Sequence, residues 1–181
     1  RVGGDAPPLR RSRLMSLVAE SSGMGGVPPE LFTAFPTFAD FTLDELRALI
    51  GTTRRWELKP GTLLFAEGSE GGSCFIVAQG AVDVSLEVNG AQQRLARLGQ
   101  GSMFGQVSLV TGEPRSATCT AATDCVLLEL ERDAAERLLG DASPMALKLL
   151  GVLNEGLIAA LRGADRRAME LEQGEGAGWS G

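Results

Sequence analysis

The sequence contains no histidine and no tyrosine among its 181 residues, and it has only three cysteines. Without histidine, Ser-His and Cys-His nucleophile pairs and most zinc and haem sites are excluded, because imidazole is the usual base or ligand in them. Cys74, Cys119 and Cys125 each lie in an apolar run, so we expect buried, reduced thiols. Such thiols are typical of a reducing compartment, and we expect a cytoplasmic protein.

An excess of positive charge is also missing. The formal net charge is −6, which argues against a broad surface for nucleic acid or an anionic membrane. No apolar run of transmembrane length and no signal peptide is visible, so we expect no membrane segment in this chain. Hydrophobic residues make up 44% of the chain, which is enough for the core of one domain. The first residue is Arg1, and we expect a piece of a larger polypeptide.

The two ends of the chain have the composition of linkers. Residues 1–29 are rich in Gly, Pro, Ser and Arg and are predicted to be a flexible tail, in which Ser12 to Glu20 can form a short helix. Residues 174–181 are a Gly-rich segment that we expect to be disordered. Between them, "FTLDELRALIG" predicts a helix with a capping box formed by Thr42 and Glu45.

From Arg54 onward the apolar period changes from that of a helix to that of a strand. "AVDVSLEV" alternates strictly, and Asn89-Gly90 after it is a strong hairpin signal because both turn positions require a positive φ. Short apolar runs separated by turn residues continue to residue 130, which predicts about eight antiparallel strands. We therefore predict an α+β fold, mainly β: an antiparallel β-roll of the double-stranded β-helix or jelly-roll-like type, with one N-terminal and two C-terminal helices. The roll and its flanking helices occupy residues 30–142.

The last third of the chain is predicted to be helical. "ERDAAERLLG" forms a short helix, and Ser143-Pro144 then supplies the N-cap and first residue of a long helix over residues 143–173. Spacings of three and four place one apolar stripe along the long helix. Its members are Leu150, Leu153, Leu157, Leu161, Ala164, Ala168 and Leu171. No helix-turn-helix follows, so we expect no direct DNA binding.

One segment, "FGQVSLVTGEPRSAT" (104–118), interrupts the strands. Gly105 and Gly112 flank a run long enough for one or two helical turns, and Arg115 follows on the return to a strand. An arginine fork matches the oxygens of a phosphate in a bidentate way, and the Ser116 hydroxyl adds a donor. The segment therefore fits a small phosphorylated ligand. From spacing alone, a plain loop with a surface ion pair remains the alternative.

The same segment resembles the phosphate-binding cassette of cyclic nucleotide-binding domains. The resemblance lies in Phe104-Gly105-Gln106-Val107-Ser108-Leu109 followed by Pro114-Arg115-Ser116-Ala117-Thr118. It continues upstream in "LKPGTLLFAEGSEGGSCFIVAQGAVDVS" and covers about residues 38–161. The family comprises the sensor domains of the catabolite activator protein, cyclic-nucleotide-dependent kinases and cyclic-nucleotide-gated channels.

The resemblance implies a binding site for cAMP or cGMP, with no cofactor and no metal. Arg115 would pair with the cyclic phosphate, flanked by Ser116 and Ala117, and backbone N–H groups at Val107 and Ser108 would face it. The implied ligand-binding residues are Phe104, Gly105, Gln106, Val107, Ser108, Arg115, Ser116 and Ala117.

At Gln106 the sequence departs from the family pattern, while Phe104 and Gly105 beside it would shape the pocket. The family has a glutamate at this position, which binds the ribose 2′-hydroxyl. A neutral amide makes a weaker bond than a carboxylate, which predicts an affinity roughly tenfold lower. The ligand choice can change as well, because the amide brings donors that glutamate lacks.

These observations predict a regulatory cyclic nucleotide-binding module that signals by movement of its C-terminal helix. The alternative is a degenerate domain that binds nucleotide weakly or not at all and serves a larger protein as a structural or dimerisation unit, with a homodimer through residues 143–173. The lid or dimer positions would be Leu149, Leu153, Leu157 and Leu161, and Asn154 and Arg162 could read a base. We expect no enzyme, since a cupin on a similar roll would need histidines as metal ligands.

Overall fold

The computed structural model describes residues 26–88 and 90–176, and the side chains of the last helix up to residue 165. The predictions for residues 1–25, for Asn89 and for residues 177–181 lie outside this part of the chain. The long C-terminal helix starts at Pro144, directly after the predicted N-cap Ser143, and ends at Gly176, three residues later than predicted.

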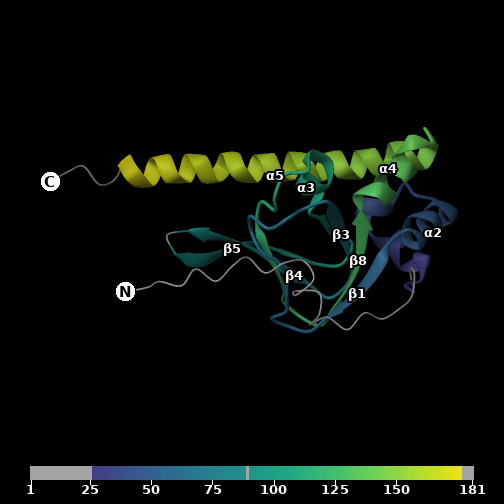
Figure 1. Ribbon diagram of the computed structural model, residues 1–181, viewed down its shortest axis with the longest axis horizontal. Coiled ribbons are helices and arrows are strands. Elements are labelled where there is room, and N and C mark those ends of the chain that lie inside the picture. Colours follow the sequence, from purple (N-terminus) through teal and green to yellow (C-terminus); the bar gives the residue numbers. More distant parts are fainter. Residues whose placement is uncertain (1–25, 89, 177–181) are drawn as a thin grey trace.

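Eight antiparallel strands form two four-stranded sheets, which confirms the predicted roll. One sheet has the order β1 (Arg54–Leu58), β8 (Cys125–Glu131), β3 (Ser73–Gln79) and β6 (Met103–Phe104). The other has the order β2 (Leu63–Phe65), β7 (Thr118–Ala121), β4 (Val82–Val88) and β5 (Ala91–Leu98). The helical elements are η2 (Pro29–Ala34), η3 (Pro36–Phe38), α2 (Leu43–Gly51), α3 (Gln106–Thr111), α4 (Arg132–Gly140) and α5 (Pro144–Gly176). Figure 1 shows α5 crossing the whole molecule beside α3 and α4.

The predicted capping box at the start of α2 is present. The Glu45 backbone N–H donates to Thr42 Oγ1 at 3.2 Å, and the Thr42 N–H donates to Glu45 Oε2 at 2.7 Å. Lys148 Nζ of α5 donates to the same carboxylate oxygen at 2.7 Å. This bond to Lys148 is the largest cause of the lowered pKa of Glu45. The backbone hydrogen bond from Thr42 in the capping box lowers the pKa further. The cap thus also ties α2 to the first turns of α5.

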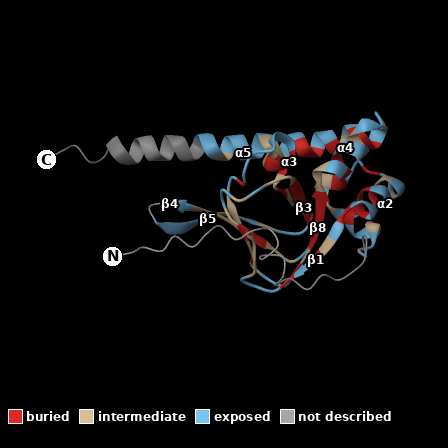
Figure 2. Ribbon diagram, in the orientation of Figure 1, coloured by how far each residue is buried: buried red, intermediate tan, exposed pale blue. Residues whose placement is uncertain are grey.

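The central strands β3 and β8 of the first sheet are buried on both faces, so their sequences are mainly apolar runs. Inward side chains such as Phe75 and Leu127 fill the roll, together with Trp56 and Phe104. The next residue on β8, Leu128, points the other way and joins a second core beneath the helices. Figure 2 shows β3 and β8 mainly in red, the colour of buried residues.

The buried face of α5 differs from the predicted stripe. Leu153 is buried as expected, but Leu150 and Leu161 remain 42% and 63% exposed. The side chains that α5 buries belong instead to Met145, Ala146, Leu149, Val152 and Leu153. The early turns of this helix are apolar on most sides, so spacing alone allows more than one stripe. Contact with α4 and the second core selects the face.

The expectation that no apolar run reaches transmembrane length needs correction. Pro144–Asp165 of α5 is long and apolar enough to cross a membrane by length and composition. A core helix passes the same test, and Leu149 and Leu153 of this segment are buried in the second core. The contacts of the first half of α5 are therefore those of a helix that packs on the roll.

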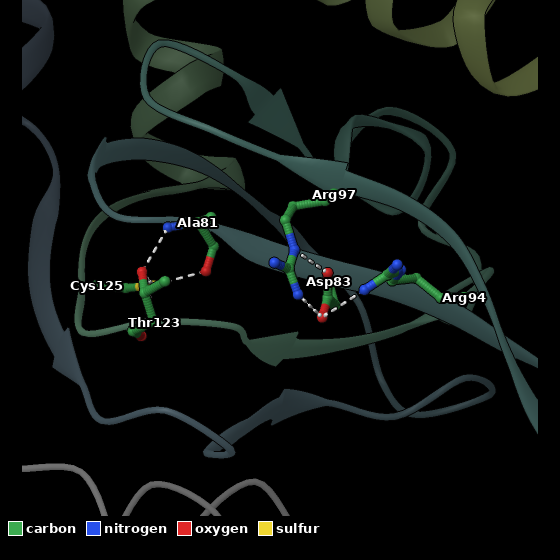
Figure 3. A network of polar contacts seen from close by, with 6 residues as sticks. All are labelled: Ala81, Asp83, Arg94, Arg97, Thr123 and Cys125. Atoms are coloured by element: carbon green, nitrogen blue, oxygen red, sulfur yellow. Dashed lines mark hydrogen bonds and ion pairs between the residues drawn. The ribbon is translucent and has the colours of Figure 1, made fainter.

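An ion-pair network joins β4 to β5 near the base of their hairpin (Figure 3). Arg97 donates to both oxygens of Asp83, at 2.7 and 2.8 Å, and Arg94 lies 3.8 Å from the same carboxylate. These arginines lower the pKa of Asp83, with the Arg97 hydrogen bonds as the largest cause. Beside the network, the Ala81 N–H donates to Thr123 Oγ1 at 3.0 Å and Cys125 Sγ donates to the Ala81 carbonyl at 2.9 Å.

We expect Asp83→Asn to lower the free energy of unfolding by about 1 kcal/mol at pH 7, since a bidentate pair at a partly exposed site is worth about that much. The folded-state pKa is depressed, so the stabilisation is present above the unfolded pKa of about 3.9 and is lost as the pH falls through the folded value. Thermal melts at pH 7 and at low pH would measure this. Arg97→Ala should resemble Asp83→Asn, whereas Arg94→Ala should cost less; equal effects of the two arginines would contradict the geometry.

Candidate functional site

A cavity of about 640 Å³ lies between the α3 segment, the β4–β5 hairpin and α5. All the ligand-binding residues predicted from the sequence line it: Phe104, Gly105, Gln106, Val107, Ser108, Arg115, Ser116 and Ala117. Further lining residues come from elements that the motif does not contain: Phe65, Val84, Leu95, Ala96, Leu98 and Cys119 of the roll, and residues of α5 between Gly156 and Ala164. The tertiary structure therefore gathers the predicted residues at one site and adds a wall from α5.

Two glycines with left-handed backbone angles hold the short helix α3 in place. Gly105 has a φ of +82° and Gly112 a φ of +77°, a region that residues with side chains rarely adopt. Space is a second reason for glycine at position 105, since a Cβ there would lie 2.8 Å from Arg115 Nη1. The sequence pattern Gly-x6-Gly thus encodes both ends of the helix and the close approach of the arginine.

Arg115 is buried, with 6% of its surface exposed, so the alternative of a surface ion pair is wrong. Its Nη1 donates to the Ser73 carbonyl at 2.6 Å and to Ser108 Oγ at 2.8 Å, and its Nη2 donates to Ser73 Oγ at 2.9 Å. The guanidinium carbon lies 4.2 Å from the ring centroid of Phe65, within the range of a cation–π contact. These contacts fix the direction of the fork at the cavity wall.

Three residues outside the motif hold Ser108 and Arg115 in place. They are Gly71, Ser73 and Arg132, and the sequence analysis did not identify them. A Cβ on Gly71 would lie 2.4 Å from the Ser108 Cβ, so the loop before β3 packs directly on α3. Arg132 Nη2, at the start of α4, donates to the Ser108 carbonyl at 2.7 Å. All three lie more than twenty positions from Ser108 in the sequence, and only the folded chain brings them together.

Gln106 is buried, with 7% exposed, and its Nε2 donates to the Met103 carbonyl at 2.9 Å. The side-chain amide also lies against Gly156 of α5. The amide nitrogen can only donate, so the amide oxygen is the acceptor that Gln106 can offer to a hydroxyl group.

The α5 wall of the cavity consists of small and aliphatic residues. Its members are Gly156, Leu157, Ala159, Ala160, Leu161, Gly163 and Ala164. Asn154 and Arg162 are exposed and do not line the cavity, so the prediction that they read a base is wrong. Their spacing along the helix places both on the side facing away from the roll.

The cysteines are buried free thiols, as predicted. Burial raises the pKa of both Cys74 and Cys119 to about 12, so neither supplies a thiolate near neutral pH. Among the described residues, no group of three or more His, Cys, Asp or Glu side chains could hold a metal ion. The polar side chains at the cavity are those of Gln106, Ser108, Arg115 and Ser116. This set can bind an anion and hydroxyl groups, but it includes no carboxylate or imidazole that could act as a general base.

Comparison with known proteins shows which family this part of the chain resembles. Residues 55–141 match the family model described as cyclic nucleotide-binding domain. The cAMP-dependent protein kinase regulatory subunit of Yarrowia lipolytica is 33% identical over 105 residues, which is 58% of this chain and 28% of that protein. A cyclic nucleotide-gated potassium channel of Mesorhizobium japonicum is 33% identical over 115 residues, 64% of this chain and 30% of the channel. The chain thus spans less than a third of the length of either relative.

Several solved structures are also similar to this chain. A cyclic nucleotide-binding domain from Methylobacillus flagellatus is similar with a TM-score of 0.67 and 29% identity, covering 79% of this chain and 82% of that one. The catabolite activator protein of Thermus thermophilus is similar with a TM-score of 0.59 and 28% identity, covering 76% and 62%. The regulatory domain of Toxoplasma gondii PKA, solved with cAMP, has a TM-score of 0.55 and 27% identity, covering 64% and 44%.

Proposed function

We propose that the chain, whose residues 55–141 match the model of the cyclic nucleotide-binding domain family, binds cAMP or cGMP and signals the bound state through α5. One observation carries the proposal. The buried guanidinium of Arg115 and the rest of the family's binding cassette line a single cavity that α5 closes on one side.

The cyclic phosphate would bind at Arg115, whose fork is oriented by Ser73 and Ser108. The Ser116 hydroxyl and the neighbouring backbone lie on the same cavity wall. The ribose would bind at Gln106, whose amide oxygen accepts a hydrogen bond from the 2′-hydroxyl. The base would occupy the apolar part of the cavity, between Leu98 of β5 and Leu157 of α5. Such a site recognises its ligand by phosphate and ribose contacts and by shape.

The signal would be a shift in the position of α5. This helix contributes both to the second core, through Leu149 and Leu153, and to the cavity wall. A ligand that binds more tightly to one α5 position than to another shifts the population toward that position. The described cavity residues offer no general base, which supports a binding role without turnover. The reduced, buried thiols fit our proposal of a cytoplasmic location.

Calorimetric titration of the chain with cAMP and with cGMP tests this function. We expect saturable heat with one nucleotide per chain and a dissociation constant in the micromolar range for the better ligand. Arginine–phosphate bonds are the main contribution, and the neutral Gln106 reduces the ribose contribution. No heat up to millimolar nucleotide, from a protein shown to be folded by circular dichroism, would refute nucleotide binding.

A second proposed role, homodimerisation through residues 143–173, is favoured by the exposed side of α5. Leu147, Leu150, Ile158 and Leu161 are 69%, 42%, 48% and 63% exposed. With 100° per residue they fall on one narrow stripe, and Asn154 lies within it. A single asparagine among apolar positions at heptad spacing is typical of a two-stranded coiled coil with a fixed register.

We expect light scattering to give the mass of a dimer at micromolar concentration, and Leu147→Glu with Leu150→Glu to give a monomer, because charges would replace the apolar seam. The control is Glu155→Gln, which changes an exposed charge on another side of the same helix. A wild-type monomer at all concentrations, with or without nucleotide, would contradict this role.

A further inference from the structure

Gly156 of α5 lies directly on the side chain of Gln106. A Cβ built on Gly156 would be 2.2 Å from Gln106 Nε2, 2.6 Å from Cδ and 3.2 Å from Cγ. Real Cβ atoms essentially never approach another atom closer than 3.0 Å. Alanine at position 156 therefore requires either α5 or the glutamine amide to move.

Gln106 is held in place from several directions. Its side chain is buried, and its Nε2 donates to the Met103 carbonyl at 2.9 Å. Its backbone begins α3 directly after the left-handed Gly105, which restricts the backbone on that side. Swinging the amide away would break the Met103 bond and leave that part-buried carbonyl without its donor, so we expect α5 to move in response.

A comparison with Gly151 of the same helix shows that this contact is specific. A Cβ on Gly151 would meet nothing within 4 Å, although Gly151 lies only five positions before Gly156. Glycine is a poor helix former at both positions. At Gly156, however, its lack of a side chain has a structural use, since it lets the backbone of α5 rest on the amide.

We propose that Gly156 is a positioning residue: its lack of a side chain lets α5 lie against Gln106, and this contact carries the state of the ribose subsite to the helix. The first part concerns the ligand-free protein alone, and the second rests on the proposed function. A ligand hydroxyl that donates to the Gln106 amide oxygen restrains the same amide on which α5 rests. By reciprocity, a change in the α5 position must change the affinity for that ligand.

Spin-label distances between α5 and the hairpin test the first part. Labels at Asp165→Cys and Gln93→Cys occupy exposed sites on α5 and β5, and the native cysteines are buried. The labelled chain is diluted with unlabelled chain, so that only distances within one molecule are measured. We expect Gly156→Ala to lengthen or broaden the distance distribution, while the control Gly151→Ala leaves it as in the wild type.

The double variant Gln106→Ala with Gly156→Ala separates this contact from a general effect on the helix. Removing the amide removes the atoms that the new Cβ would strike, so the wild-type distance should return. A distance unchanged in Gly156→Ala would overturn the proposal, because the glutamine would then have yielded. A distance not restored in the double variant would overturn it too.

Titration of the same variants with cAMP tests the second part. Gly156→Ala should weaken binding about tenfold, within the usual range of coupling between sites, and Gly151→Ala should change it less than about twofold. Equal affinity of Gly156→Ala and wild type would overturn the transmission to α5. If no variant binds nucleotide but the distances respond as expected, the proposed function and the ribose coupling fail, while the positioning role of Gly156 stands.

Discussion

Replacing Arg115 with alanine is expected to weaken cyclic nucleotide binding at least about 100-fold. A hydrogen bond from an arginine to a phosphate is worth about 1.5–3 kcal/mol, and a bidentate fork makes two, so the loss is about 3 kcal/mol or more. At 1.4 kcal/mol for each factor of ten, this exceeds two orders of magnitude. The buried position of Arg115 at the cavity wall, where water competes little, favours the upper part of the range. Calorimetry at matched protein concentration measures it.

Two companion variants separate the roles of charge and geometry. Arg115→Lys keeps the charge but loses the planar fork, and should bind between wild type and Arg115→Ala. Ser73→Ala removes one acceptor that orients the fork but leaves the Ser73 carbonyl bond, so its affinity should fall less than about tenfold. Arg115 also stacks on Phe65, so each variant needs a thermal melt to show that it is folded. Wild-type affinity in a folded Arg115→Ala protein would show that the anion binds elsewhere.

Replacing Gln106 with glutamate is expected to destabilise the ligand-free protein by about 2–3 kcal/mol at neutral pH. An ionised carboxylate cannot donate to the Met103 carbonyl, which costs a hydrogen bond of about 1 kcal/mol. The remaining cost comes from burying a charge beneath α5, where the Gln106 side chain is 7% exposed. The sequence alone predicted that the family's glutamate would improve ribose binding. The structure adds this opposing cost, which urea denaturation measures.

The stability deficit of Gln106→Glu is expected to depend on pH, and the burial of the new carboxyl group determines the direction. Burial raises the pKa of a carboxyl group in the folded state above its unfolded value of about 4.3. Such a group contributes stability below the unfolded pKa and loses it as the pH rises through the folded pKa. The deficit of Gln106→Glu should therefore be full near pH 8 and shrink toward pH 4, where the protonated acid can donate to Met103.

The matched control is Gln93→Glu, the same change of charge at an exposed position of β5. It should alter stability by less than about 0.5 kcal/mol at either pH. A deficit of Gln106→Glu that does not depend on pH would show that the carboxylate reaches solvent, contrary to the packing of Gly156 on this side chain.

The strands and helix ends of this protein could be predicted from its sequence. Alternation of apolar residues predicted the strands, the Thr42–Glu45 pair predicted the start of α2, and two glycines bounded α3. Each of these signals spans only a few residues, and each acts through backbone geometry or hydrogen bonds within that span. The cassette motif could be recognised for the same reason, because its fixed positions are contiguous in the chain.

The tertiary structure decided which distant groups the cassette meets. Arg115 is oriented by Ser73, forty-two positions away, and Gln106 is covered by Gly156, fifty positions along the chain. The buried face of α5 could not be predicted from the sequence either. The early turns of this helix are apolar on most sides, and only packing selects one of them. Sequence spacing determines what a segment can form by itself. Contacts between segments depend on the three-dimensional packing of the whole roll, which no short pattern contains.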